Sequence, residues 1–285
     1  MAVAWLESQR WEAAIEETRE GGHATALSSH AAERGYDVVV ACGGDGTINE
    51  VANGLAGTDT ALAVIRGGTA NVWAKEASIP RDPLSAVRLV VEGRRRRMDL
   101  GLVEGVEASR FFMLMAGVGL DARVVDRVPE RLKKRLGAAA YVFFGLRGSL
   151  SFRPRPVSLF IDGEAVTADM LWLLAANTRS YGGVIDIARD AVADDGLLDV
   201  YLFESRSARQ TFAHGLSILR RKYDASGILR RRAREIRIVS SEELDCQVDG
   251  EKLHFAPRSI RIAPRALTVV LPEGRRSPLF AEESV

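Results

Sequence analysis

The chain contains the stretch Val38-Val39-Val40-Ala41-Cys42-Gly43-Gly44-Asp45-Gly46-Thr47, in which a β-branched apolar run meets a glycine-rich turn. The continuous apolar character of Tyr36–Cys42 predicts a strand that is buried on both faces of a sheet. Beyond the turn, apolar residues recur at the spacing of an amphipathic helix, at Ile48, Val51, Ala52 and Leu55. A strand, a tight turn and a helix in this order are typical of the βαβ units of a parallel sheet.

The same alternation continues over the first hundred residues. The further expected elements are a helix or helix-to-strand join at Trp11–Glu20, a helix at Ala24–Arg34, a strand at Ala61–Ile65, a helix from Ala70 and a helix at Pro83–Glu92. A second glycine turn, Gly67-Gly68-Thr69, follows the second strand. We therefore expect residues 1–98 to form an α/β domain with a Rossmann-like parallel sheet and helices on both faces.

From Met98 onward the pattern changes to short strands separated by turns such as Asp162-Gly163 and Asp249-Gly250. The expected strands are Phe111–Ala116, Val157–Ile161, Met170–Ala176, Leu197–Phe203, Glu235–Val239, Leu244–Val248 and Ser259–Ala263. This spacing predicts a mainly antiparallel β-sandwich over residues 99–285, and we expect its C-terminal tail to pack back on the first domain.

The composition is that of a globular protein, with 47% hydrophobic and 27% charged residues among 285. The longest apolar runs, Phe111–Leu120 and Met170–Ala176, are far shorter than a membrane span of ~20 residues. The first residues lack the basic start of a signal peptide. Cys42 and Cys246 are interpreted as core thiols of a protein in a reducing compartment. We therefore expect a cytoplasmic protein.

Two segments concentrate positive charge on a chain whose net charge is only +1. Residues 123–155 hold nine Lys/Arg against two Asp/Glu, and residues 220–237 hold eight against two. Such blocks favour a face that binds anions. A solvated surface rich in arginine is an equally good interpretation of the same pattern.

The two glycine turns predict a phosphate site. The start of a helix presents unpaired N–H groups and the positive end of the helix dipole, and glycines let the backbone approach a phosphate closely. Thr47 can cap the helix or bind a phosphate oxygen. The carboxylate of Asp45 would repel phosphate, so it suits an anion site only if a divalent cation lies between the carboxylate and the phosphates. Because successive parallel strands end side by side, both turns are expected to line one nucleotide site with Mg²⁺.

These turns and three later motifs resemble the diacylglycerol kinase catalytic-domain family, the soluble bacterial lipid kinases related to sphingosine and ceramide kinases. The matching motifs, in chain order, are Gly43–Leu55, Gly68–Asn71, Gly117–Ala122, Asp194–Val200 and Gln247–Glu251. The match runs over nearly the whole chain, and five motifs in the family's order are specific where one would not be. The resemblance implies an ATP-dependent kinase that phosphorylates the hydroxyl of diacylglycerol or a related lipid.

The resemblance also implies roles for individual residues. ATP would be held by Thr18, Gly43, Gly44, Asp45, Gly46, Thr47, Ile48, Asn49 and Thr69. A structural Mg²⁺ would be held by the carboxylate of Asp195 and by the backbone carbonyls of Val192 and Leu197. Asp45 and Asp99 would join the water network around that ion. The expected partner is a lipid substrate at the inner face of the membrane, with no nucleic acid, and a homodimer is left open.

Glu251, with Asp249 two residues before it, would take the proton from the lipid hydroxyl. In an extended segment, residues two apart point to one side, and the repulsion of two carboxylates raises one pKa and favours a proton acceptor. A plain hairpin turn is the competing interpretation, because the same triplet occurs as Asp162-Gly163-Glu164. Only the order of the family motifs selects the later copy.

The sequence departs from the family at several places, and Arg66 and Arg189 stand where prolines are usual. The family usually begins with a strand and an Asn-Pro-x-Ser-Gly phosphate loop, which we expect to be missing here, and Val72 stands where an aspartate is usual. Two alternatives stay open. A phosphotransferase similar to NAD kinase would share the glycine–aspartate turn, and a non-catalytic relative that binds nucleotide or lipid would explain the missing loop and Val72.

Overall fold

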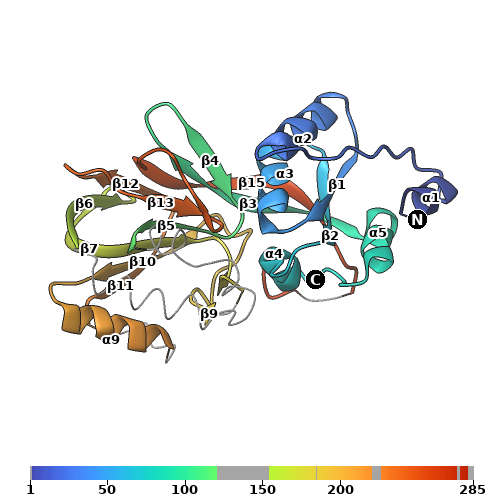
Figure 1. Cartoon of the computed structure of the whole chain (residues 1–285). Helices are drawn as coiled ribbons and strands as arrows, with labels where there is room; N and C mark the ends of the chain where they lie inside the picture. Colours follow the sequence, from blue (N-terminus) through green and yellow to red (C-terminus); the bar gives the residue numbers. More distant parts are fainter. Residues whose placement is uncertain (1, 121–153, 184, 220–225, 275–276, 282–285) are drawn as a thin grey trace.

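The computed structural model describes residues 2–120, 154–183, 185–219, 226–274 and 277–281. Figure 1 shows two halves side by side, an α/β half that carries the N-terminus and a β half made mostly of strands. The α/β half contains α1 (Ala2–Ser8), α2 (His23–Glu33), β1 (Val38–Gly43), α3 (Asp45–Leu55), β2 (Ala61–Arg66), α4 (Val72–Glu76) and α5 (Pro83–Glu92). The β half contains β4 (Ser109–Phe112), β5 (Met115–Gly119), β6 (Arg155–Ile161), β7 (Glu164–Ala176), β8 (Ser180–Tyr181), β9 (Ile185–Asp186), β10 (Leu198–Glu204), α9 (Ala208–Leu219), β11 (Ile228–Ala233), β12 (Glu235–Val239), β13 (Cys246–Val248) and β14 (Glu251–Lys252).

The α/β half is built around the parallel strands β1 and β2, as the sequence predicts. Successive residues of β2 point to opposite faces, so that Leu62 and Val64 join the core beneath α3 whereas Ala61 and Ala63 join the one beneath α5. Helices cover both faces of this sheet, which explains why the strand sequence is apolar throughout. The first turn of α5 is capped by Asp82, whose carboxylate accepts the N–H of Ser85.

Two long strands, β3 (Arg94–Glu104) and β15 (Ser259–Leu271), run through both halves (Figure 1). They pair antiparallel along their length, with an irregularity between Ala263 and Leu267. The last part of β15 also pairs parallel with β2, so the C-terminal strand completes the sheet of the α/β half. The predicted boundary at residue 98 therefore lies in the middle of β3, within a strand that the two halves share.

The β half is mainly antiparallel, in agreement with the prediction. β7 lies at its centre and pairs with β6, β5 and β10. One apolar core includes residues of both halves, among them Ile48, Trp73, Leu100, Met113 and Tyr201. A second core fills the β half alone. Because one core crosses the junction, the α/β half and the β half are packed together.

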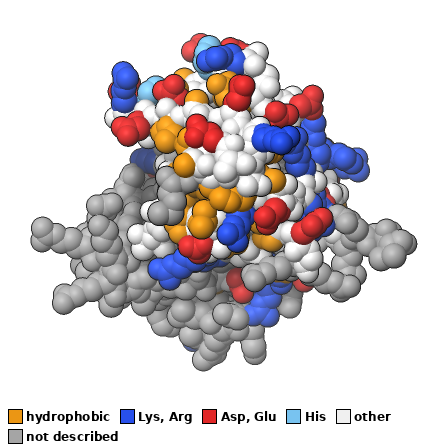
Figure 2. Space-filling model, turned by 90° about the vertical axis from the view of Figure 1, so that its right-hand side faces the viewer, with side chains coloured by type: hydrophobic (Ala, Val, Ile, Leu, Met, Phe, Trp, Pro, Cys, Tyr) orange, Lys and Arg blue, Asp and Glu red, His pale blue; other side chains and the backbone are white. Residues whose placement is uncertain are grey.

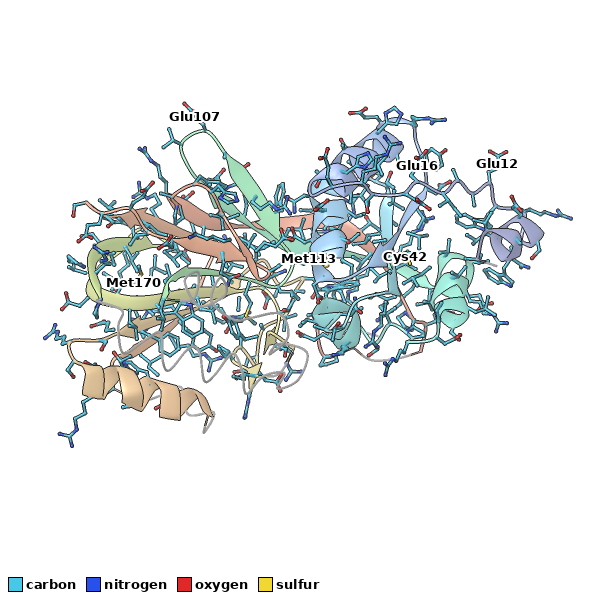
Figure 3. The ribbon with its side chains drawn as sticks, in the orientation of Figure 1. Glu12, Glu16, Cys42, Glu107, Met113 and Met170 are labelled. Carbon is cyan, nitrogen blue, oxygen red and sulfur yellow. The ribbon has the colours of Figure 1, made fainter. Side chains whose placement is uncertain are left out.

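Three expectations are wrong. Trp11–Glu20 forms neither a helix nor a strand, because its side chains are exposed or only partly buried, as Glu12 and Glu16 illustrate in Figure 3. Cys42 is exposed at the end of β1, although Cys246 is buried as expected. The predicted strand Phe111–Ala116 is divided into β4 and β5 by a bend at Met113, for a reason given below.

The first basic segment, 123–155, lies almost wholly outside the described residues, and the second lies partly outside them. Within the second, Arg230 pairs with Asp190 and Arg232 contacts Asp195, so these cations are already neutralised. On the face of the α/β half seen in Figure 2, acidic and basic side chains are interspersed. Among the described residues, no helix is long and apolar enough to cross a membrane.

Candidate active site

The first glycine turn is shorter than the sequence suggests. β1 ends at Gly43, Gly44 caps the helix, and α3 already begins at Asp45, so that Gly46 and Thr47 lie in its first turn. A Cβ placed on Gly43 would lie 2.7 Å from Thr47 Oγ1, so the hydroxyl of Thr47 packs directly over the turn. The first N–H groups of an eleven-residue helix thus face the end of the parallel sheet.

The two glycine turns are in direct contact. Gly67 N–H donates to the carbonyl of Gly43 at 2.9 Å, and a Cβ on Gly68 would lie 2.5 Å from the Cα of Gly44. Only glycine fits at Gly68, because backbone atoms occupy the space of any side chain. The two turns therefore lie side by side at one end of the parallel sheet, as expected for neighbouring parallel strands.

Asn71 joins the turns from one side. Its Nδ2 donates to the carbonyl of Gly43 at 2.9 Å, and its Oδ1 accepts the N–H of Gly68 at 3.0 Å. The residue has φ 46° and ψ 57°, a left-handed conformation that asparagine tolerates better than most residues. Asn71 is buried, so these bonds lie out of water and stabilise the pair of turns.

Asp45 is tied to the second turn by a hydrogen bond of 2.6 Å from Val72 N–H. Burial raises the pKa of Asp45, and the N–H groups of Val72 and Asn71 and the charge of Lys75 oppose that rise. The side chain of Val72, where an aspartate is usual in the family, is buried in the core of the α/β half. The carboxylate of Asp45 therefore connects the first turn of α3 to the start of α4, the helix that follows the second glycine turn.

Asp249 organises the junction between the halves. Its carboxylate accepts three consecutive backbone N–H groups, from Met113, Leu114 and Met115, at 2.8 to 2.9 Å. It also accepts a hydrogen bond of 2.7 Å from Nδ2 of Asn49 on α3. The chain bends between β4 and β5 so that three N–H groups can converge on one carboxylate, which explains why the predicted strand is broken. Met113 lies at this junction in Figure 3.

The geometry of Asp249 differs from the extended arrangement predicted. Asp249 and Gly250 have φ 50° and 88° and form the turn between β13 and β14, so Asp249 and Glu251 do not lie in one extended segment. The pKa of Asp249 is raised to about 6, and the chief cause is desolvation of the enclosed carboxylate. The predicted cause, repulsion by Glu251, is therefore wrong. Four donors surround the Asp249 carboxylate, so it acts as an acceptor within the protein.

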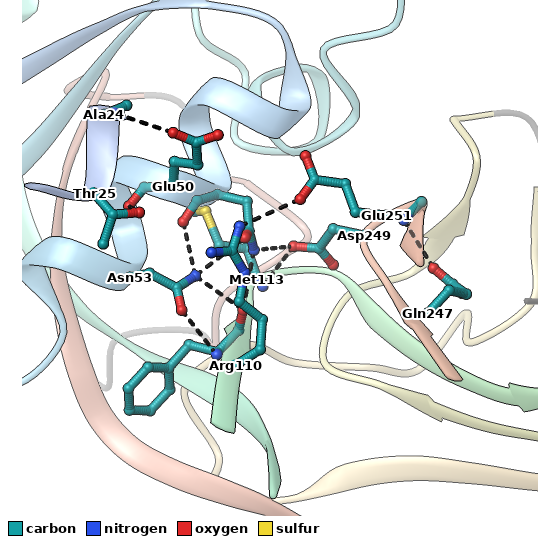
Figure 4. A network of polar contacts seen from close by, with 12 residues as sticks. Ala24, Thr25, Glu50, Asn53, Arg110, Met113, Gln247, Asp249 and Glu251 are labelled. Carbon is teal, nitrogen blue, oxygen red and sulfur yellow. Dashed lines mark hydrogen bonds and ion pairs between the residues drawn. The ribbon is translucent and has the colours of Figure 1, made fainter. Parts of the chain in front are cut away.

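Glu251 begins β14 and reaches the first glycine turn. A Cβ on Gly46 would lie 2.6 Å from Oε1 of Glu251, so this carboxylate rests against the first turn of α3. The other oxygen, Oε2, is 3.3 Å from Nη2 of Arg110 on β4. The side chain of Glu251 is 45% exposed, which leaves its carboxylate accessible to a substrate. Figure 4 shows Glu251, Arg110 and Asp249 close together.

Asn53 fixes β4 against α3. Its Oδ1 accepts the N–H of Phe111 at 2.9 Å and its Nδ2 donates to the carbonyl of Phe111 at 3.0 Å (Figure 4). Asn49, one turn earlier on the helix, donates to the same carbonyl at 3.2 Å. The helix that follows the glycine turn thus holds the strand that carries Arg110.

The earlier Asp-Gly-Glu copy forms a similar turn, between β6 and β7, with φ 47° and 86° at Asp162 and Gly163. The carboxylate of Asp162 accepts the N–H groups of Arg234 and Glu235. Glu164 is exposed there. The two copies share their backbone geometry, and the position of Glu251 against Gly46 is what distinguishes them.

The expected metal ligands lie on the loop before β10. Oδ1 of Asp195 accepts the N–H of Leu197 at 3.0 Å, and Oδ2 contacts Arg232. Asp99 holds the same loop, because its carboxylate accepts the N–H groups of Gly196 at 2.7 Å and of Arg265 at 2.6 Å. The pKa of Asp99 is raised, first by burial and then by the neighbouring carboxylates, Asp195 among them.

The three predicted Mg²⁺ ligands, the carboxylate of Asp195 and the carbonyls of Val192 and Leu197, all belong to this loop and are oxygen donors, the kind of ligand that Mg²⁺ prefers. In the part of the chain that the structure describes, no three Asp, Glu, His or Cys side chains converge as a metal site. An ion here would therefore depend on backbone carbonyls and water. Arg232 supplies the positive charge beside Asp195 in this structure.

Not every expected ATP contact reaches the two turns. Thr69 is exposed on the second turn, as a ligand would require. Thr18 is exposed on the segment before α2, and no hydrogen bond among the described residues joins it to either turn. The side chain of Ile48 is buried in the core, and its N–H donates to the carbonyl of Gly44, the residue that caps α3. Asn49 is also buried, and its amide contacts Asp249 and Phe111.

The predicted site residues did not include Arg110, Asn53 and Asn71. Asn53 and Asn71 lie within the two motifs quoted above, and for Asn71 a signal existed in the tolerance of asparagine for the left-handed conformation. Arg110 belongs to no quoted motif. Its place beside Glu251 depends on the pairing of β4 with β3, which local sequence does not determine.

Comparison with known proteins agrees with this architecture. The family described as "Diacylglycerol kinase catalytic domain" matches residues 2–103, and that described as "YegS C-terminal NAD kinase beta sandwich-like domain" matches residues 115–271. The chain is 32% identical to "Diacylglycerol kinase" of Bacillus subtilis (strain 168), over 96% of this chain and 90% of that protein. It is 36% identical to the protein named "Probable lipid kinase YegS-like" of Pseudomonas putida, over 98% and 92% respectively.

A solved structure shares the fold. The crystal structure of a diacylglycerol kinase from Bacillus anthracis str. Sterne superimposes with a TM-score of 0.73 at 25% identity, covering 90% of this chain and 84% of that one. The two family matches together span both halves and include the glycine turns and the Glu251 hairpin. The chain belongs to the diacylglycerol kinase catalytic-domain family, in the form that carries a YegS-type C-terminal domain.

Proposed function

We propose that this protein is an ATP-dependent lipid kinase that transfers the terminal phosphate of ATP to the hydroxyl of diacylglycerol or a related lipid. The observation that carries the proposal is the contact between Glu251 and Gly46, which brings an accessible carboxylate of the β half against the phosphate-type turn of the α/β half. A kinase needs both groups at one place, because phosphoryl transfer depends on positioning and charge neutralisation.

In the proposed reaction the paired turns hold the phosphates of ATP. N–H groups at the start of α3, the hydroxyl of Thr47 and the exposed second turn with Thr69 surround them. The lipid hydroxyl oxygen attacks the γ-phosphorus, the bond from that phosphorus to the bridging oxygen breaks, and ADP leaves with the electron pair. The carboxylate of Glu251 takes the hydroxyl proton.

Asp249 has a different part in this proposal. Its carboxylate is surrounded by four protein donors, so it holds the Glu251 hairpin in place and does not itself exchange a proton with the lipid. Asn49 acts through the same bond, from the helix that carries the first turn. Both are positioning residues.

Mg²⁺ bound with the nucleotide would neutralise phosphate charge. Asp45, at the contact of the two turns, is the carboxylate that would face it. A structural ion would be held by Asp195 with the carbonyls of Val192 and Leu197, and Asp99 would brace that loop through its bonds to Gly196 and Arg265.

A vesicle assay tests the proposed function. The purified chain is given Mg²⁺ and ATP labelled at its terminal phosphate, together with vesicles that contain diacylglycerol and, separately, with NAD. Label in the lipid phase is the expected result. Label in NADP, or nucleotide binding without transfer, would overturn the proposal.

Two variants sharpen the assay. Glu251→Gln should abolish lipid phosphorylation and leave ATP binding close to that of the wild type, because the exchange removes the proton acceptor and keeps its shape. Glu164→Gln makes the same exchange in the exposed earlier copy and should leave turnover unchanged. Incubation with a total lipid extract would then identify the acceptor.

A further inference from the structure

A charged residue outside every motif contacts the proposed proton acceptor. Arg110 Nη2 is 3.3 Å from Oε2 of Glu251, while the other oxygen of that carboxylate, Oε1, rests against Gly46. One carboxylate therefore connects the guanidinium to the first glycine turn. The side chain of Arg110 is only 22% exposed, so its charge is partly withdrawn from water.

The position of Arg110 is fixed by the α/β half. Asn53 on α3 binds both the N–H and the carbonyl of Phe111, the next residue along β4. β4 also pairs with β3, where Arg110 lies opposite Val103. Because α3 begins at the glycine turn, the helix that would bind phosphate also sets the place of the arginine.

The site concentrates negative charge, which a nearby cation would neutralise. Asp45, Asp249 and Glu251 contribute carboxylates, and a nucleotide triphosphate would add further negative charge. Arginine presents a planar set of donors that matches a phosphate or a carboxylate with two parallel hydrogen bonds. The guanidinium that contacts Glu251 in this structure can therefore donate the same hydrogen bonds to a phosphoryl oxygen.

We propose that Arg110 is a further catalytic residue, which holds the Glu251 carboxylate before the reaction and stabilises the transferred phosphoryl group during it. The proposal rests on the proposed kinase function. As the hydroxyl proton passes to Glu251, that carboxylate becomes neutral and no longer satisfies the guanidinium. The guanidinium of Arg110 then binds an oxygen of the phosphoryl group that has moved to the lipid. The same proton transfer that neutralises Glu251 thus frees Arg110 to stabilise the negative charge on that group.

The test compares Arg110→Ala, Arg110→Lys and Arg261→Ala in the vesicle assay. Arg261 forms a matched arginine–glutamate pair with Glu104, at 3.1 Å, elsewhere on β3 and β15. We expect Arg110→Ala to lower kcat about a hundredfold with a smaller change in the KM of ATP. Arg110→Lys should keep part of the activity as a point charge, and Arg261→Ala should stay within about twofold of the wild type.

Chemical rescue separates a catalytic charge from a structural one. Millimolar guanidinium chloride, too dilute to unfold the protein, should restore part of the kcat of Arg110→Ala and should not restore that of Glu251→Gln. Circular dichroism and thermal unfolding check that each variant is folded, and Arg110→Lys carries the test if the alanine variant is not. A kcat for Arg110→Ala within about threefold of the wild type, or a loss equal in all arginine variants without rescue, would overturn the proposal. Absence of lipid phosphorylation by the wild type would instead refute the proposed function.

Discussion

Asn49 on α3 donates a hydrogen bond of 2.7 Å to the carboxylate of Asp249, although 200 residues separate the two in sequence. The bond joins the helix of the first glycine turn to the hairpin that carries Glu251. Asn49 is 2% exposed, so the bond lies out of water. An acceptor that loses its donor there lowers the stability of the fold, because water cannot replace the hydrogen bond. The alignment of the two halves of the site therefore depends on this pair.

Replacing Asn49 by leucine should separate activity from folding. The change leaves one acceptor position of Asp249 unfilled, and we expect a loss of about 1–3 kcal/mol in the free energy of unfolding, measured in urea. Turnover should fall at least tenfold, because the hairpin is no longer held on α3. Ser28→Ala removes another buried side-chain bond, on α2, and should lower stability without lowering kcat. A leucine variant with the wild-type kcat would remove Asn49 from the positioning network.

Gly46→Ala is expected to reduce activity without reducing stability. Alanine is favoured over glycine inside a helix by about 0.5–1 kcal/mol, and nothing in the backbone of Gly46 disfavours it. The added Cβ would lie 2.6 Å from Oε1 of Glu251, and the flexible carboxylate would have to move. We expect Tm to be unchanged or higher and kcat to fall about tenfold. Equal kcat for the variant and the wild type would show that Glu251 need not rest against the turn.

Much of this site follows from local sequence. The apolar spacing of Ile48, Val51 and Leu55 gives α3 its buried face, and the strand before it lies as predicted, although α3 begins earlier than expected, at Asp45. Asp82 and Pro83 mark the start of α5, which matches its predicted bounds. These features depend on neighbours within a few residues, which is why the pattern alone is sufficient.

The features that the sequence misses depend on distant contacts. The break after β4 arises because Met113, Leu114 and Met115 turn their N–H groups toward Asp249, more than a hundred residues later. β15 continues past Arg265 and pairs with β2, which no local pattern encodes. The raised pKa of Asp249 comes from its enclosure, so it could not be derived from the spacing of two carboxylates.

Asn71 allows the backbone and side-chain contributions of one residue to be measured apart. Asn71→Gly keeps the left-handed conformation accessible and loses the bonds to Gly43 and Gly68. Asn71→Ala loses the same bonds and also disfavours that conformation, by about 1–2 kcal/mol. We therefore expect both variants to bind ATP less tightly and to be less stable, with the alanine variant the less stable of the two in urea. Equal stability would show that the left-handed backbone imposes no strain on a side chain here.

Glu76 on α4 should make stability depend on pH near neutrality. Its carboxylate accepts the N–H groups of Arg179 and Ser180, each at 3.0 Å, and burial, reinforced by the charge of Asp186, raises its pKa to about 7. The ordinary pKa of a glutamate side chain is 4.5. Between pH 4.5 and about pH 7, the folded state therefore holds a proton on Glu76 more often than the unfolded state does. The free energy of unfolding must therefore fall as pH rises through that window.

Glu76→Gln removes this titration and keeps the size of the side chain. Relative to the wild type, its free energy of unfolding should rise between pH 5 and pH 8, by at most about 3 kcal/mol, when both are measured in urea. Asp82→Asn is the control, because hydrogen bonds from Ser85 hold the pKa of Asp82 below its ordinary value and its titration lies below this range. Its difference from the wild type should be the same at both pH values. A constant difference for Glu76→Gln as well would show that Glu76 is already ionised at pH 5 in the folded protein, and that the loop of Arg179 and Ser180 is held by a charged carboxylate throughout.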